Sequence, residues 1–143
     1  MSRAEFSRAA PPRPEDFRFR ASEKIRYADQ DPQGHVNNVV FATYLEIGRT
    51  TVLPALLEIE AGAAFVVARL VLDYLSELAF PGDVLICTRL ASAGRSSLKL
   101  EQALFQAGHC AAVASSVLVL VDGATRRPRT ISQAGREWIS ARS

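Results

Sequence analysis

The chain has 143 residues, 48% of them hydrophobic and 22% charged, which is the composition of a single globular domain with an apolar core. Seventeen Lys and Arg against 15 Asp and Glu give a net charge of +2, too small to indicate a nucleic-acid-binding protein. The positive charge lies at the ends of the chain: residues 1–26 and residues 122–143 each carry a net charge of +3, whereas residues 27–121 carry −4.

Several classes of protein are excluded by what the sequence lacks. Cys87 and Cys110 are the only cysteines, so a disulfide-stabilised secreted domain is excluded, and two free thiols fit a reducing cytoplasm. Charged side chains interrupt residues 1–20, which contain no apolar stretch of the kind found in a secretory signal. The longest uncharged apolar run, residues 111–121, is too short for a membrane span, which needs about 20 residues.

The first 14 residues are predicted to be a flexible basic leader, because they combine prolines with Arg and Ala and contain few apolar side chains. The remaining residues, 15–143, are predicted to form one domain. It opens with a strand, since apolar and polar side chains alternate from Phe17 to Ser22, and this prediction extends the strand to Tyr27. The Asp, Pro and Gly content of residues 29–34 then predicts a turn.

Residues 39–53 have the period of a helix whose apolar side chains cover a wide arc and leave one polar stripe. Asn37 and Asn38 are predicted to cap its start. Pro54 is expected to kink or restart the helix, because proline lacks an N–H and suits a first helical turn. Gly62 ends the helical segment.

The pattern after Gly62 is that of strands. Four of them are predicted, at residues 64–75, 84–91, 97–105 and 112–121. Their short connections favour antiparallel pairing into one sheet. Because the sheet and the mostly apolar helix must cover each other, we predict an α+β domain with a curled sheet wrapped around a long central helix.

This element order and one short motif resemble the hot-dog fold, in particular the 4-hydroxybenzoyl-CoA thioesterase-like family of acyl-CoA thioesterases. The resemblance covers about residues 17–131, and its most specific part is Asp-x-x-Gly-His-Val-Asn-Asn at residues 31–38. Further similar stretches are residues 26–30, 44–49, 73–75, 81–83 and 94–97. The resemblance implies an acyl-CoA substrate, with coenzyme A as part of that substrate and no separate cofactor. It also implies a homodimer or homotetramer.

Asp31 is the residue that the resemblance assigns as catalytic. Thioester hydrolysis needs a base or nucleophile beside the carbonyl carbon and donors for the developing oxyanion, and a helix start supplies unpaired N–H groups. Spacing alone favours a structural role for Asp31 in a turn with Pro32, and the resemblance reverses this preference because the family's catalytic aspartate matches Asp31. The family's oxyanion position matches Asn38, and Gly34 would let the backbone approach the substrate closely. His35 completes the predicted catalytic set, although a structural role at the loop–helix junction stays open.

The predicted substrate-binding residues are spread over the second half of the chain. They are Tyr74, Arg95, Ser96, Ser97, Lys99 and Arg126. Arg95, Ser96, Ser97 and Lys99 are expected either to line a path for the pantetheine or phosphates or to form a solvated hairpin. Arg126 and its basic neighbours are expected to hold the nucleotide phosphates of coenzyme A.

Glu46 is weighed because a related branch of hot-dog thioesterases uses a carboxylate on the central helix. Here Arg49 follows three residues later, so a surface ion pair is predicted for Glu46 instead. Cys87 and Cys110 are predicted to be inert core or strand residues. The two histidines, His35 and His109, lack metal-ligand spacing, so no metal is predicted.

The sequence therefore predicts an acyl-CoA thioesterase with Asp31 as general base or nucleophile. The alternative is a hot-dog protein that binds an acyl-CoA or another acyl ligand without turning it over. A hot-dog dehydratase would need a histidine base and an acidic partner in an arrangement that the chain does not show.

Overall fold

The computed structural model describes residues 10–143, so most of the predicted leader, residues 1–9, lies outside the described residues. Five antiparallel strands form one sheet in the order β1-β3-β4-β5-β2. The strands are β1 (Phe19–Lys24), β2 (Ala63–Tyr74), β3 (Asp83–Ala93), β4 (Ser97–Gln106) and β5 (His109–Asp122). The helices are α1 (Asn38–Arg49), α2 (Leu53–Ile59) and α3 (Gln133–Arg142).

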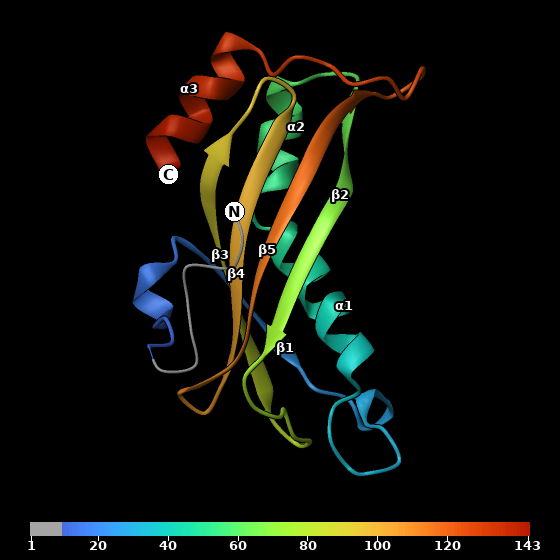
Figure 1. Cartoon of the computed structure of the whole chain (residues 1–143), viewed down its shortest axis with the longest axis vertical. Coiled ribbons are helices and arrows are strands. Elements are labelled where there is room, and N and C mark those ends of the chain that lie inside the picture. The colour runs from blue at the N-terminus through green and yellow to red at the C-terminus, as the bar shows by residue number, and fades with distance from the viewer. Residues whose placement is uncertain (1–9) are drawn as a thin grey trace.

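The sheet curls along one side of α1 and α2, which lie behind it in Figure 1. Inward-facing side chains of the strands and the apolar face of α1 form the main core, which includes Phe41, Tyr44, Leu45, Ile86 and Leu104. This arrangement is the hot-dog fold, and it confirms the predicted α+β class. None of the helices formed by residues 10–143 is long and apolar enough to cross a membrane.

The start of α1 and the break after it follow the sequence prediction. Asn37 is the N-cap, and its Oδ1 accepts a hydrogen bond of 2.9 Å from the backbone N–H of Val39. α1 ends at Arg49, and α2 begins at Leu53 with Pro54 in its first turn. Proline therefore restarts the helix, as its missing N–H favours.

Gly48 brings α1 close to the sheet. A Cβ at this position would lie 2.5 Å from Cγ2 of Ile86 and 2.6 Å from Nε2 of Gln102. The same amide nitrogen of Gln102 donates to the carbonyl of Leu45 (2.9 Å) and to Oγ1 of Thr88 (3.0 Å). A buried amide thus fastens the middle of α1 to β3 and β4, and only glycine leaves room for it.

Two predictions about the N-terminal part of the domain are wrong. The strand begins at Phe19 because Pro14–Asp16 forms a 3-10 turn that closes with a hydrogen bond from Phe17 N–H to Pro14 carbonyl. The strand also ends at Lys24 rather than near Tyr27, because Tyr27–Asp29 forms a second 3-10 turn.

Helix α3 was not predicted from the sequence. Ser132 caps it, and its Oγ accepts from Gly135 N–H (3.0 Å) while donating to Oε2 of the buried Glu60 (2.7 Å). Ile139 then packs into the core cluster around α2. The periodicity of so short and polar a helix is weak, and its apolar contacts become visible only once the chain is folded.

Candidate functional site

The start of α1 borders a pocket of about 380 Å³. Its walls come from the loop before α1, the first turn of α1, and the end of β2 with the segment after it. The residues that line it include Asp31, His35, Val36, Asn38, Phe41 and Tyr74. Four predicted site residues from two distant parts of the sequence therefore share one pocket, and Gly34 lies in the same loop.

Asp31 uses one carboxylate oxygen to hold its own loop. Its Oδ1 accepts from the backbone N–H groups of Gln33 (2.9 Å) and His35 (3.3 Å), and its own N–H donates to the His35 carbonyl (2.7 Å). Within residues 10–143, Oδ2 accepts no hydrogen bond. The carboxylate is therefore oriented through one oxygen, while the other is available to water or substrate.

The loop around Asp31 is closed by Gly34 and His35. Gly34 has φ +87°, a left-handed conformation that glycine adopts without steric cost, and its N–H donates to the Asp31 carbonyl (3.0 Å). The imidazole Nε2 of His35 lies 2.8 Å from Oε2 of Glu77, in the segment after β2. His35 thus ties the loop to the opposite wall of the pocket.

Asn38 supplies a backbone donor at the start of α1. Val39 N–H donates to Oδ1 of Asn37 and Val40 N–H to the Asn37 carbonyl, whereas the N–H of Asn38 has no acceptor among residues 10–143. The positive end of the helix dipole adds to this donor. The hydroxyl of Tyr74 donates to the Asn38 carbonyl (2.8 Å) and so holds the end of β2 against this turn.

A buried carboxylate, Asp29, lies two residues before Asp31 in the chain. Asp29 is 2% exposed, and it accepts hydrogen bonds from Arg26 and from the hydroxyl of Tyr44 (2.9 Å). Burial alone would raise the pKa of Asp29, but these hydrogen bonds and the guanidinium charge hold the pKa below its ordinary value. Burial and the bond to Asp29 raise the pKa of Tyr44, so its hydroxyl stays protonated.

The other predicted substrate-binding residues lie at the far end of the sheet. Tyr74 pairs with Ala112 on β5, whereas Ser97 reaches β5 at Val119, seven residues away or about 23 Å along the strand. Figure 1 shows the β3–β4 turn and the segment after β5 at the end opposite to the loop before α1. Within one chain, none of Arg95, Ser96, Ser97, Lys99 and Arg126 therefore lines the Asp31 pocket.

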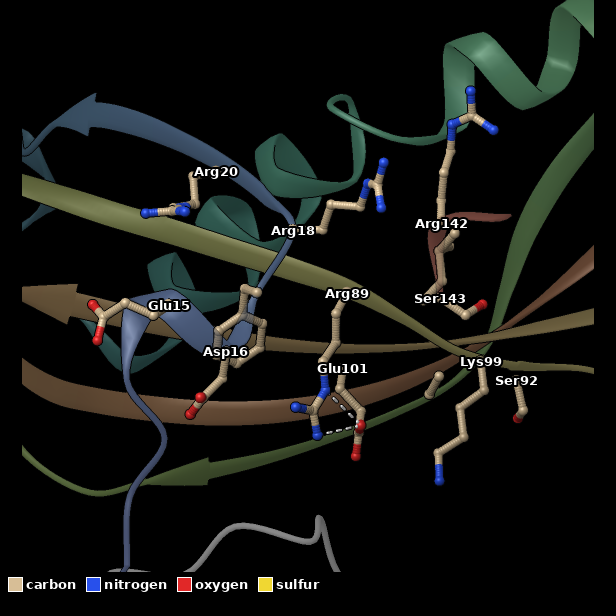
Figure 2. A pocket seen from close by; sticks show the side chains of 13 residues that line it. Glu15, Asp16, Arg18, Arg20, Arg89, Ser92, Lys99, Glu101, Arg142 and Ser143 are labelled. Atoms are coloured by element: carbon tan, nitrogen blue, oxygen red, sulfur yellow. Dashed lines mark hydrogen bonds and ion pairs between the residues drawn. The ribbon is translucent and has the colours of Figure 1, made fainter. Parts of the chain in front are cut away.

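A larger hollow of about 870 Å³ lies on the face of the sheet turned away from α1 (Figure 2). Glu101 projects to this side because its neighbours Leu100 and Gln102 point into the core under the helices. In the hollow, Arg89 donates to Oε1 of Glu101 through Nε (3.0 Å) and Nη2 (2.9 Å), as the dashed lines in Figure 2 mark. Lys99 also lines it, so this predicted residue belongs to the outer face.

Sequence reasoning missed the far wall of the pocket, formed by Leu75, Ser76 and Glu77. No local signal marks these residues, because they meet the loop at Asp31 only through the pairing of β2 with β5. The predicted ion pair between Glu46 and Arg49 is wrong, since in the described part of the chain no side-chain nitrogen of Arg49 lies within 4 Å of a carboxylate oxygen of Glu46. Glu46 is exposed, whereas Nη1 of Arg49 is buried beside the start of α2 and has no hydrogen-bond partner among the described residues.

The two cysteines lie outside the pocket. Cys87 is fully buried and Cys110 is partly buried, and burial raises the pKa of both thiols to about 11. Neither thiol is ionised near neutral pH, which rules out a thiolate nucleophile there. Within the described residues, no three His, Cys, Asp or Glu side chains gather in a way that could hold a metal ion.

A curled antiparallel sheet packed along a long helix defines a hot-dog protein, and here an aspartate loop and a pocket lie at the start of that helix. Residues 25–139 match the family model of the thioesterase-like superfamily, so the chain belongs to this superfamily. No curated protein matches the sequence.

Similar solved structures agree with membership of the thioesterase-like superfamily. A thioesterase from Thermus thermophilus, solved in complex with coenzyme A and Zn, is 38% identical, with 89% of this chain and 95% of that chain covered and a TM-score of 0.80. A protein from Pseudomonas aeruginosa PAO1 is 29% identical, with 92% and 96% covered and a TM-score of 0.76. The DHNA-CoA thioesterase from Staphylococcus aureus, 22% identical with 86% and 87% covered and a TM-score of 0.74, shares the fold.

Proposed function

We propose that the protein hydrolyses an acyl-CoA thioester to the free acid and coenzyme A, in a reducing cytoplasm and without a separate cofactor. One observation carries this proposal: Asp31 and Asn38 line the same pocket, and within residues 10–143 Oδ2 of Asp31 accepts no hydrogen bond and the N–H of Asn38 has no acceptor. Thioester hydrolysis needs such a base or nucleophile next to an oxyanion donor. The Thermus thermophilus thioesterase solved with coenzyme A supports the choice of a CoA ester.

Two routes use the same residues. As a general base, Asp31 Oδ2 takes a proton from water while the water oxygen attacks the thioester carbon. As a nucleophile, Oδ2 attacks this carbon directly and forms an anhydride, which water then hydrolyses. In both routes the carbonyl oxygen becomes an oxyanion stabilised by the N–H of Asn38 and the helix dipole. The C–S bond then breaks, and coenzyme A leaves as a thiolate that takes up a proton.

The two routes differ in where the oxygen of the product acid comes from. A single turnover in ¹⁸O-water places ¹⁸O in the acid if Asp31 acts as a base. If Asp31 is a nucleophile and water attacks the aspartyl carbon of the anhydride, the label enters the enzyme carboxylate instead. Mass spectrometry of the peptide that contains Asp31 reads this second outcome.

We further propose that the protein is a homodimer joined through the free edge of β2. This strand has twelve residues and lies at the edge of the sheet, where Val67 (49% exposed), Leu70 (38%) and Tyr74 (43%) present apolar surface. Among residues 10–143 no strand pairs with the outer edge of β2, and an edge strand of this length and character favours pairing with another strand. A two-fold axis requires the two β2 strands to run antiparallel.

This pairing would bring the basic residues at one end of the sheet close to the Asp31 pocket of the other subunit. Antiparallel β2 edges place the Ala63 end of one sheet beside the Tyr74 end of the other. The Ala63 end is the one that carries Arg95 and Arg126, so these residues of one subunit would approach the Asp31 pocket of its partner. The basic side chains would then hold the nucleotide phosphates of coenzyme A, with the acyl group between α1 and β2.

The test is release of free coenzyme A from a panel of acyl-CoAs that covers short, long and aromatic acyl groups, read with a thiol dye. We expect turnover on at least one member, with no added metal or cofactor. No turnover on the panel, combined with binding of an acyl-CoA in calorimetry, would establish the alternative of a non-catalytic acyl-CoA-binding protein.

A further inference from the structure

Asp29 is the most completely bonded carboxylate near the pocket. Its Oδ2 accepts from Arg26 N–H (2.9 Å) and from the Tyr44 hydroxyl (2.9 Å), and its Oδ1 accepts from Arg26 Nε (3.0 Å) and Nη2 (2.8 Å). Tyr44 belongs to the second turn of α1 and is itself buried. One carboxylate thus links the chain before the loop to the helix after it.

The main chain of Asp29 completes the same link. Its carbonyl accepts from Asn37 N–H (2.8 Å), directly before α1, and Gln30 forms a bridge with Val36. Inside this bridge Asp31 N–H donates to the His35 carbonyl. Two sets of hydrogen bonds therefore close the loop that holds Asp31. The inner set joins Asp31 to His35, and Asp29 provides the outer set with both its side chain and its backbone.

We propose that Asp29 is a positioning residue that holds the Asp31 carboxylate in register with the first N–H of α1. This inference rests on the proposed hydrolysis. Asp29 does not line the pocket, so it acts through the loop and not on the substrate. The geometry matters because base and oxyanion donor come from opposite ends of the loop, and a misplacement of about 1 Å can cost about 10²-fold in rate.

Asp29→Asn is the direct test, since it keeps the size of the side chain but removes the charge. Asparagine has one acceptor oxygen and an NH₂ donor, so it cannot accept from the Arg26 N–H, the guanidinium and the Tyr44 hydroxyl together. Tyr44→Phe removes only the bond to α1. It serves as the second variant if Asp29→Asn does not fold.

The chain offers a matched control in its first 3-10 turn. Arg13–Asp16 repeats the pattern of Arg26–Asp29, and Oδ2 of Asp16 accepts from Arg13 N–H (2.8 Å), as Asp29 does from Arg26. Asp16 is exposed and lies on the outer face of the sheet, away from Asp31. Asp16→Asn therefore makes the same chemical change in the same type of turn without touching the loop.

Steady-state kinetics on the best acyl-CoA should separate positioning from binding. We expect kcat to fall by about 10- to 100-fold in Asp29→Asn and by about 3- to 10-fold in Tyr44→Phe, with KM within about threefold of wild type. Asp16→Asn should retain wild-type kcat. Hydrogen exchange should accelerate in residues 30–37 of Asp29→Asn, while the strands keep their protection.

Two outcomes would overturn the inference. One is a kcat in Asp29→Asn that equals that of Asp16→Asn while wild type is active. The other is a rise in KM that accounts for the whole loss, since this would place Asp29 in substrate binding. If wild type hydrolyses no thioester, the proposed hydrolysis fails, and exchange in residues 30–37 still tests whether Asp29 fixes the loop.

Discussion

His35 and Glu77 join the two walls of the candidate site, with Nε2 of the imidazole 2.8 Å from Oε2 of the carboxylate. His35 comes from the loop before α1 and Glu77 from the segment after β2, and both residues line the pocket, so the contact joins its two walls. Both side chains are accessible, 41% for His35 and 68% for Glu77. A polar contact exposed to this degree contributes about 0–1 kcal/mol to stability.

His35→Asn should therefore change activity less than loss of a catalytic group. We expect kcat to fall by less than about tenfold, because general acid–base groups contribute about 10²–10⁴. Glu77→Gln, which removes only the partner, should have a still smaller effect. Steady-state kinetics on both variants checks this, and a loss of 10²-fold or more in His35→Asn would instead make the imidazole part of the chemistry.

Asp31→Asn should lower kcat by about 10²–10⁴, the range for a positioned general base, because it removes the negative charge that either route requires. KM should change much less, since the apolar and phosphate contacts remain. Melting temperature should stay close to wild type, because asparagine also suits a turn and its amide oxygen can accept the bonds from Gln33 and His35.

Glu46→Gln is the control for Asp31→Asn. Glu46 is exposed on α1 and lies outside the pocket, so most of the activity should remain. An active Asp31→Asn together with an inactive Glu46→Gln would move the catalytic carboxylate to the helix and refute the assignment.

Gly48→Ala should destabilise the fold although alanine is the better helix former. The intrinsic preference favours alanine by about 1 kcal/mol. Against this, the added Cβ would meet Ile86 and Gln102 at 2.5 and 2.6 Å, and overpacking of this kind costs about 1–3 kcal/mol. We expect a net loss in urea unfolding, with Thr43→Ala on the exposed face of α1 changing stability by less than about 0.5 kcal/mol. Equal stabilities of the two variants would contradict the close approach.

The cysteines should not react with thiol reagents at pH 7–8 in the native protein, because burial raises the pKa of Cys87 and Cys110 to about 11. These values lie above the pKa of an unfolded cysteine, about 8.5. Their contribution to stability is thus fully present below pH 8.5 and is lost as the pH rises towards 11. Dye labelling across pH 7–11 and in denaturant checks this, and rapid labelling at pH 7 would contradict it.

Added salt should raise the KM for acyl-CoA more than the KM for a truncated pantetheine thioester. Arginine side chains such as Arg126 and Arg127 are exposed, and charges at this degree of exposure are screened within about 10 Å at 0.1 M salt. We expect KM for acyl-CoA to rise with salt while KM for the pantetheine ester changes little. Equal salt effects on both substrates would remove the argument for phosphate contacts.

The sequence alone determined the fold class, the restart at Pro54 and the N-cap at Asn37, because each depends on local chemistry: side-chain period, a missing N–H, a capping carbonyl. It also singled out Asp31, through the resemblance of residues 31–38 to a family motif. Local signals were sufficient wherever neighbours in sequence are neighbours in space.

Only the tertiary structure decided which distant residues meet Asp31 and which do not. Tyr74 and Glu77 reach the pocket because β2 pairs with β5 along its full length and ends at the start of α1. Ser97 lies about 23 Å from Tyr74 along the strands for the same reason, since antiparallel register fixes the end of the sheet that each residue occupies, and Arg95 lies in the turn just before Ser97. The burial of Asp29 could not be predicted from the sequence either, because its partner Tyr44 lies fifteen residues further along the chain.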